Sequence, residues 1–307
     1  IMADSVGNIM INTAAGLSIL NTEKNTLTSY PEGGHLSSSI SKCIADTGGL
    51  FWISSYEMGV ITFDLYKRNF KKIDKTGGLL SNINWDMIKD RQGNLWIGSD
   101  SGITVMNPAN NTIQYLREKD GLCDNVVFKL IQHSNGEIWA GTVKGISIIN
   151  TNNFTITNLT RKEGLVPQEI YDLAEHNGTV YAGSSDGLIS IKKPSQSGNK
   201  KMPWRFINYG KREGFPYNDY NQNTGMVTKN GKGWWGVTPV VTVVTQEPLE
   251  DTLLPKINIT GIQIMDQPLS FNSWSLLSNQ LKNTDTLWDE TKKNFYLKNS
   301  LPKDSGY

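Results

Sequence analysis

Three aromatic side chains, each followed directly by a charged one, recur at a fixed interval in this chain. The pairs stand 43 residues apart, as Trp85–Asp86, Phe128–Lys129 and Tyr171–Asp172. Aromatic faces with polar groups beside them suit stacking against a sugar or another flat amphipathic ligand. The same rings could instead pack as core between structural elements, and the sequence leaves both interpretations open.

Further aromatic and polar residues extend this candidate binding surface. Tyr56 precedes a loop glycine, and the irregular stretch "PYNDYNQN" is rich in tyrosine and asparagine. For that stretch, ligand binding and a purely structural loop are equally open interpretations. The full set of candidate ligand-binding residues is Tyr56, Trp85, Asp86, Phe128, Lys129, Tyr171, Asp172, Tyr217, Asn218 and Tyr220.

A repeated sequence motif shows which structural elements must position these residues. The copies read "GLFWISS", "GNLWIGS", "GEIWAGT" and "GTVYAGS", and their aromatic anchors, separated by 44, 43 and 42 residues, are Trp52, Trp96, Trp139 and Tyr181. A period in the low forties with one such strand per repeat is typical of a β-propeller. We expect the anchors to pack between blades as core, rather than to form a ligand box.

Two weaker copies extend the series, so that six repeats cover most of the chain. Met10 stands at the anchor position of the first copy, and Trp234 in the last follows a longer interval that an insertion at 192–203 absorbs. The last repeat has Val240 where a loop glycine is expected. The predicted propeller spans 1–247, with repeats at about 1–40, 41–84, 85–127, 128–170, 171–221 and 222–247.

Each repeat is predicted to form four strands. Apolar residues make the first strand, and a turn such as "DRQGN" follows, where Asp can bond the backbone and glycine can take a positive φ. The second strand carries the anchor, and a glycine-closed loop leads to the third. A fourth, outer strand then returns the chain at Gly78, Gly121 and Gly164, which are 43 residues apart.

Composition and histidine placement argue against several other functions. With 30 basic and 29 acidic residues and no basic patch, the segment is not expected to bind nucleic acid. The repeat register keeps His35 away from His133 and His176, so no histidine–carboxylate centre is predicted. We therefore predict no catalytic residue, metal site or cofactor. Cys43 and Cys123 occupy different repeat positions and suggest no disulfide framework.

The ends of the chain differ from its repeats. After Pro248 the period stops, and alternating apolar residues around Gly261 predict the first strands of a β-sandwich that 248–307 would begin but not complete. No apolar run is long enough to span a bilayer. The opening residues already fit a repeat, so we expect the natural chain to begin earlier.

The ordered motif series resembles the two-component regulator propeller repeat. The clearest copy has Asp90, Gly93, Asn94, Trp96, Gly98, Gly102, Asn107 and Pro108, then Gly121 and Leu122. The segment from about Leu254 resembles the start of the triple-tyrosine domain that follows such propellers. The resemblance covers about four-fifths of the chain.

This resemblance implies a function for the segment. It implies a non-catalytic, extracytoplasmic sensor, periplasmic in an inner-membrane protein, which binds a small molecule such as an oligosaccharide. A histidine kinase outside this chain would receive the signal, and the parent protein could form a homodimer. Because propellers host many functions, two alternatives stay open. These are a protein-interaction scaffold and, with less support, a propeller lyase.

Overall fold

The computed structural model describes most of the chain up to residue 244. The described residues are 2–3, 7–13, 16–30, 40–166, 168–193, 196–197, 200–201, 204–210, 215, 220–244, 263–264, 267–268, 286–289 and 294–297. They lie in strands, turns and short 3-10 turns, which confirms the predicted all-β class. The chain separates into two units, Ile1–Glu247 and Pro248–Tyr307.

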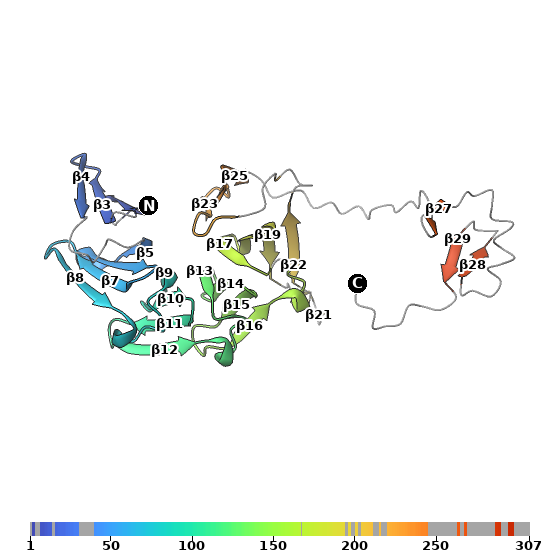
Figure 1. Cartoon of the computed structure of the whole chain (residues 1–307), viewed down its shortest axis with the longest axis horizontal. Helices are drawn as coiled ribbons and strands as arrows, with labels where there is room; N and C mark the ends of the chain where they lie inside the picture. The colour runs from blue at the N-terminus through green and yellow to red at the C-terminus, as the bar shows by residue number, and fades with distance from the viewer. Residues whose placement is uncertain are drawn as a thin grey trace. The chain divides into compact units, whose positions relative to one another are not determined.

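The first unit is a series of antiparallel sheets in which chain neighbours pair (Figure 1). The first sheet holds β1 (Met2–Ala3), β2 (Ile9–Thr13), β3 (Gly16–Asn21) and β4 (Thr26–Tyr30). The second holds β5 (Ile40–Ala45), β6 (Leu50–Ser55), β7 (Gly59–Asp64) and β8 (Asn69–Ile73). The third holds β9 (Asn84–Lys89), β10 (Leu95–Ser99), β11 (Gly102–Asn107) and β12 (Thr112–Leu116).

The remaining sheets of this unit follow the same plan. The fourth holds β13 (Val127–Gln132), β14 (Ile138–Thr142), β15 (Gly145–Ile149) and β16 (Ile156–Leu159). The fifth holds β17 (Ile170–His176), β18 (Thr179–Ser184), β19 (Gly187–Lys192) and β22 (Arg205–Tyr209). Between β19 and β22 lies the small hairpin of β20 (Gln196–Ser197) and β21 (Lys200–Lys201), inside the predicted insertion. The sixth sheet has three strands, β23 (Met226–Val227), β24 (Gly233–Val237) and β25 (Val240–Val244).

Short 3-10 turns connect these strands. They are η1 (Thr47–Gly49), η2 (Lys75–Gly77), η3 (Glu118–Asp120) and η4 (Arg161–Glu163). The last three lie where an outer strand returns to the next sheet, and each ends at a left-handed glycine, Gly78, Gly121 or Gly164. A positive φ at that place costs glycine little, because it has no Cβ. The left-handed backbone at these positions thus explains why glycine recurs there in each repeat.

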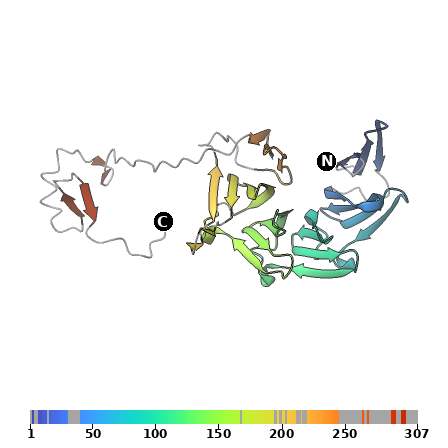
Figure 2. The same ribbon diagram turned by 180° about the vertical axis from the view of Figure 1, so that it is seen from behind.

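The sheets stand side by side in chain order, with their first strands on the inner side (Figure 2). Strands β5, β9, β13 and β17 each contact the next in this series. Apolar side chains of neighbouring sheets form the core between them, and one such layer joins Trp139 and Ile148 to Leu173 and Val180. The predicted β-propeller architecture, with an incomplete last blade, is confirmed.

The anchor residues behave as core except at the last sheet. Trp96 and Trp139 are fully buried, and Trp52 and Tyr181 are nearly so. Trp234, at the same repeat position, keeps 36% of its surface exposed. The difference arises because each earlier anchor faces a following sheet, and no following sheet covers Trp234 among the described residues.

In the second unit the structure describes two pairs of short strands. They are β26 (Gln263–Ile264) with β27 (Gln267–Pro268), and β28 (Thr286–Asp289) with β29 (Asn294–Leu297). The β-sandwich that we expect over 248–307 stays a prediction. Across the described residues, no helix has the length and apolar character needed to cross a membrane.

Candidate ligand-binding face

Four of the predicted aromatic residues form a continuous arc across four sheets. The ring of Tyr56 lies 5.3 Å from that of Trp85, Trp85 lies 5.6 Å from Phe128, and Phe128 lies 5.3 Å from Tyr171. All four side chains are half-buried. We call Tyr56, Trp85, Phe128 and Tyr171 the aromatic arc. The rings therefore pack on one another and also keep part of their surface exposed to solvent.

A repeated β-bulge explains why these rings point together. In β13, Val127 and Lys129 pair with adjacent residues of β14, so Phe128 is the extra residue of a bulge. The same register shift occurs at Tyr171 in β17. Trp85 in β9 is likewise the unpaired residue between two paired ones. Bulges redirect side chains and are common next to functional sites. One backbone irregularity at one repeat position thus places three of the four arc rings, and Tyr56 joins them from the turn between β6 and β7.

The charged partners of the arc residues turn inward instead. Asp86 and Asp172 are fully buried, and Lys129 retains only 6% exposure. The ammonium of Lys129 lies 3.1 Å from a carboxylate oxygen of Asp172 and 3.9 Å from one of Asp86. We call these three residues the axial charge cluster. It joins the first strands of the third, fourth and fifth sheets by ion pairs.

Burial and the neighbouring charges shift the pKa values of this cluster in opposite directions. Burial opposes the charged form of Lys129, but the carboxylates of Asp86 and Asp172 together hold its pKa above the ordinary value. Burial raises the pKa of Asp172, and the nearby ammonium only partly offsets that effect. One oxygen of Asp86 accepts a hydrogen bond from the Leu130 amide at 3.0 Å, while its other oxygen is buried without a partner.

A segment from the start of the sixth sheet covers the axial charge cluster. The side chain of Asn223 accepts a hydrogen bond from Lys129 at 2.8 Å and donates one to the Trp85 carbonyl at 3.0 Å. The amides of Thr224 and Gly225 donate to Asp172. Gln222 also donates to the carbonyl of Phe128, at 2.9 Å. We call residues 222–225 the axial segment.

These contacts separate the predicted binding residues into two groups. The aromatic arc is accessible, whereas Asp86, Lys129 and Asp172 lie beneath the axial segment. Contact of those three with a ligand stays a prediction. Tyr220 is also buried, packed with Tyr181 and Trp235 in the core of the last two sheets. Tyr217 and Asn218 lie outside the described residues.

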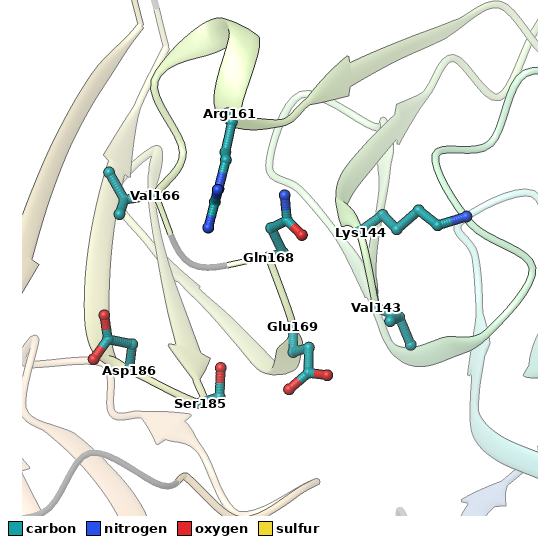
Figure 3. Close-up of a pocket in the computed structure, with 8 residues that line it drawn as sticks. All are labelled: Val143, Lys144, Arg161, Val166, Gln168, Glu169, Ser185 and Asp186. Atoms are coloured by element: carbon teal, nitrogen blue, oxygen red, sulfur yellow. The ribbon is translucent and has the colours of Figure 1, made fainter. Parts of the chain in front are cut away.

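Beside the arc, a hollow of about 480 Å³ opens between the fourth and fifth sheets (Figure 3). It is lined by Val143, Lys144, Arg161, Val166, Gln168, Glu169, Ser185 and Asp186. Loops between second and third strands meet the return connection of the chain here. The hydroxyl of Tyr171 donates to Glu169 at 2.7 Å, so the arc borders the hollow.

The sequence analysis did not predict this hollow. The signal was present as a reversal of charge between repeats. Arg161 begins η4 where Glu118 begins η3, and Asp186 precedes the glycine of β19 where Lys144 precedes that of β15. Comparing charges position by position along the repeat could have found this feature.

The histidines and cysteines of the described residues do not form a reactive cluster. His133 is buried and stacks on Trp139, with ring centroids 5.5 Å apart, and His176 bonds Asn177. Within the described ranges, no group of three metal-ligating side chains occurs. Cys43 and Cys123 are free thiols, and burial raises the pKa of Cys43 to about 12. His35 lies outside the described residues.

The repeat and the fold both match known proteins. The two-component regulator propeller repeat is recognised at residues 78–101, which confirms the resemblance inferred from the motif series. The fold is similar to the extracellular domain of a protein described as a hybrid two-component system from B. thetaiotaomicron. That match has a TM-score of 0.72 and 20% identity, covering 88% of this chain and 38% of the other.

Other solved structures share the fold at similar or lower identity. A second B. thetaiotaomicron extracellular domain, also described as a hybrid two-component system, gives a TM-score of 0.65 and 18% identity over 88% of this chain and 36% of that one. Streptogramin B lyase gives 0.58 and 13%, over 78% of this chain and 76% of the lyase. No curated protein sequence matches the chain.

These comparisons define a class rather than a function. The chain is an array of propeller sheets that carries the two-component regulator propeller repeat. It spans less than two-fifths of the length of the two extracellular domains. At such identities the likeness shows the fold alone, so neither sensing nor lyase chemistry transfers with it.

Proposed function

We propose that this chain is the ligand-sensing part of an extracytoplasmic sensor in a two-component system. The repeat at residues 78–101 and the shared fold with two such extracellular domains support the proposal. The signal would pass to a histidine kinase outside the chain, in a protein anchored in the inner membrane. Pairing of two parent proteins would provide one route for that signal.

The observation that carries the sensing role is the accessible aromatic arc. Four half-buried rings lie in contact on one face, and three of them are placed there by repeated bulges. Aromatic faces bind the apolar faces of sugar rings, while nearby polar groups bind the hydroxyls. An oligosaccharide is therefore the ligand class that this surface suits best.

Isothermal titration calorimetry of the 307-residue chain against a panel of glycan fragments would test this function. At least one fragment should bind, and Trp85→Ala should weaken that binding at least tenfold while the folded state is retained. Trp85→Phe, which keeps an aromatic face, should bind more tightly than Trp85→Ala. Absence of binding across the panel would contradict the proposal. Unfolding of Trp85→Ala would instead assign that ring to the core, and Tyr171→Ala would then serve as the binding test.

A second candidate function, a protein-interaction scaffold, is favoured by the outward face of the sixth sheet. Met226, Trp234 and Val243 are cross-strand neighbours on that face, and all three are exposed. A large exposed apolar row of this kind is common at protein interfaces. Analytical ultracentrifugation of the chain and of Trp234→Ser would test self-association. Loss of a concentration-dependent oligomer in the variant would support this candidate.

A further inference from the structure

The same two repeat positions carry charged side chains at two adjacent junctions between sheets. The charges are paired at the first junction and, among the described residues, unpaired at the second. At the junction of the third and fourth sheets, the ammonium of Lys144 lies 2.9 Å from Asp124 and 3.3 Å from Glu118. The ammonium of Lys144 is therefore paired with two carboxylates. Lys144 also reaches the edge of the hollow, but its charge is already paired.

At the next junction the charges are exchanged and held apart. Arg161 takes the place of Glu118 at the start of the 3-10 turn, and Asp186 takes the place of Lys144 before the third strand. In the part of the chain that the structure describes, neither the guanidinium of Arg161 nor the carboxylate of Asp186 has an ion-pair or hydrogen-bond partner. The hollow of about 480 Å³ lies between them.

The walls of the hollow offer a cation on one side and hydrogen-bond acceptors on the other. Figure 3 shows Arg161 reaching into it towards Gln168, with Asp186 and Ser185 on the side of the fifth sheet. The carboxylate of Glu169 is half-buried and is held in place by the hydroxyl of Tyr171 at 2.7 Å. The volume lies within the range of small-molecule sites, which is roughly 300–1,000 Å³.

We propose that this hollow binds a saccharide that carries a carboxylate or sulfate group. The planar guanidinium of Arg161 would bind the anionic group through two parallel hydrogen bonds. Asp186 and Glu169 would accept hydrogen bonds from sugar hydroxyls, and the sugar would extend towards Tyr171 of the aromatic arc. This inference rests on the proposed sensing function and specifies its ligand class.

Titration calorimetry of the 307-residue chain with trigalacturonic acid, maltotriose and sodium sulfate would test the inference. The anionic trisaccharide should bind at least tenfold more tightly than either of the other two. Arg161→Ala should weaken it at least tenfold, and Arg161→Lys should restore only part of the loss, because an ammonium cannot form the paired hydrogen bonds. Added salt should weaken binding, since the site is open to solvent.

Lys119→Ala is the matched control, because Lys119 is an exposed cation in the equivalent turn of the preceding repeat. It should leave binding unchanged. If maltotriose binds as well as trigalacturonic acid and Arg161→Ala has no effect, this inference is wrong while the sensing function stands. If sulfate alone binds as tightly as the trisaccharide, the saccharide class is wrong. If no saccharide binds, both this inference and the proposed function fail.

Discussion

At the residue scale, the indole N–H of the anchor tryptophan has a hydrogen-bond partner in some repeats and, within the described residues, none in another. Asp90 accepts a hydrogen bond from the indole of Trp96 at 2.7 Å, and Asp46 does the same for Trp52 at 2.9 Å. In the fourth repeat the aspartate position holds His133, and the indole nitrogen of Trp139 is buried without a partner. Leaving a buried donor unsatisfied costs about 1–3 kcal/mol.

We therefore expect His133→Asp to stabilise the protein by about 1 kcal/mol, because the new carboxylate could accept from the Trp139 indole. Urea denaturation at pH 7 would measure the change in the free energy of unfolding. The reciprocal variant, Asp90→His, should be destabilising by a similar or larger amount. The explanation would be wrong if His133→Asp lowered stability as much as His133→Ala.

At the element scale, the bulges at Phe128 and Tyr171 need room in the preceding sheet. A Cβ added at Gly141 of β14 would lie 2.9 Å from the carbonyl oxygen of Ile170, which directly precedes the bulged Tyr171. A Cβ at Gly98 of β10 would lie 3.0 Å from the Val127 carbonyl, beside the next bulge. The single glycine of β10 and that of β14 therefore allow the next sheet to approach.

Gly141→Ala should lower the free energy of unfolding by about 1–3 kcal/mol, because a methyl group there meets backbone atoms that cannot move freely. It should also move the Tyr171 ring and weaken the binding of any ligand to the arc. Thermal unfolding and calorimetry would measure the two effects. Gly77→Ala is a suitable control, since Gly77 does not have a positive φ and a Cβ there meets only the end of the Ile73 side chain, at 3.3 Å. Equal destabilisation by both variants would contradict the packing argument.

At the scale of the first unit, the axial segment ties the sixth sheet to three earlier ones. Its hydrogen bonds reach Trp85, Phe128 and Asp172, which belong to the third, fourth and fifth sheets. Asp172 lies in the neighbouring fifth sheet, whereas the bonds to Trp85 and Phe128 reach sheets that do not adjoin the sixth in the series. The bulged aromatic residues contribute their carbonyls to the same connection.

Asn223→Ala should loosen the sixth sheet, because it removes a partner from both Lys129 and the Trp85 carbonyl. We expect a loss of about 1–3 kcal/mol, as for other buried polar groups that lose a partner. Hydrogen exchange should become faster in β23 and β24 and stay unchanged in β10 and β11. Asn152→Ala, in an exposed turn of the fourth sheet, should have no such effect. A uniform increase across all sheets would contradict a local tie.

Much of the fold could be predicted from the sequence because the determinants are local and periodic. The turn glycines, the anchor tryptophans and the alternating apolar residues each specify a strand or a turn within one repeat. Stacking of similar units then follows from their shared apolar faces. The position of the aromatic arc could be predicted for the same reason, since Trp85, Phe128 and Tyr171 occupy one position of the period.

The tertiary structure alone decided which polar residues of these repeats are accessible. A lysine at the surface and a lysine on the axis recur with the same period and have the same residue type. The sequence therefore could not show that Lys129 is buried and Lys144 is exposed. Burial of Asp86, Lys129 and Asp172 depends on the axial segment, whose hydrogen bonds to this region span 52 to 138 residues of the chain. The hollow beside Arg161 likewise depends on the spacing of two sheets, because a cavity is a property of distance and not of residue order.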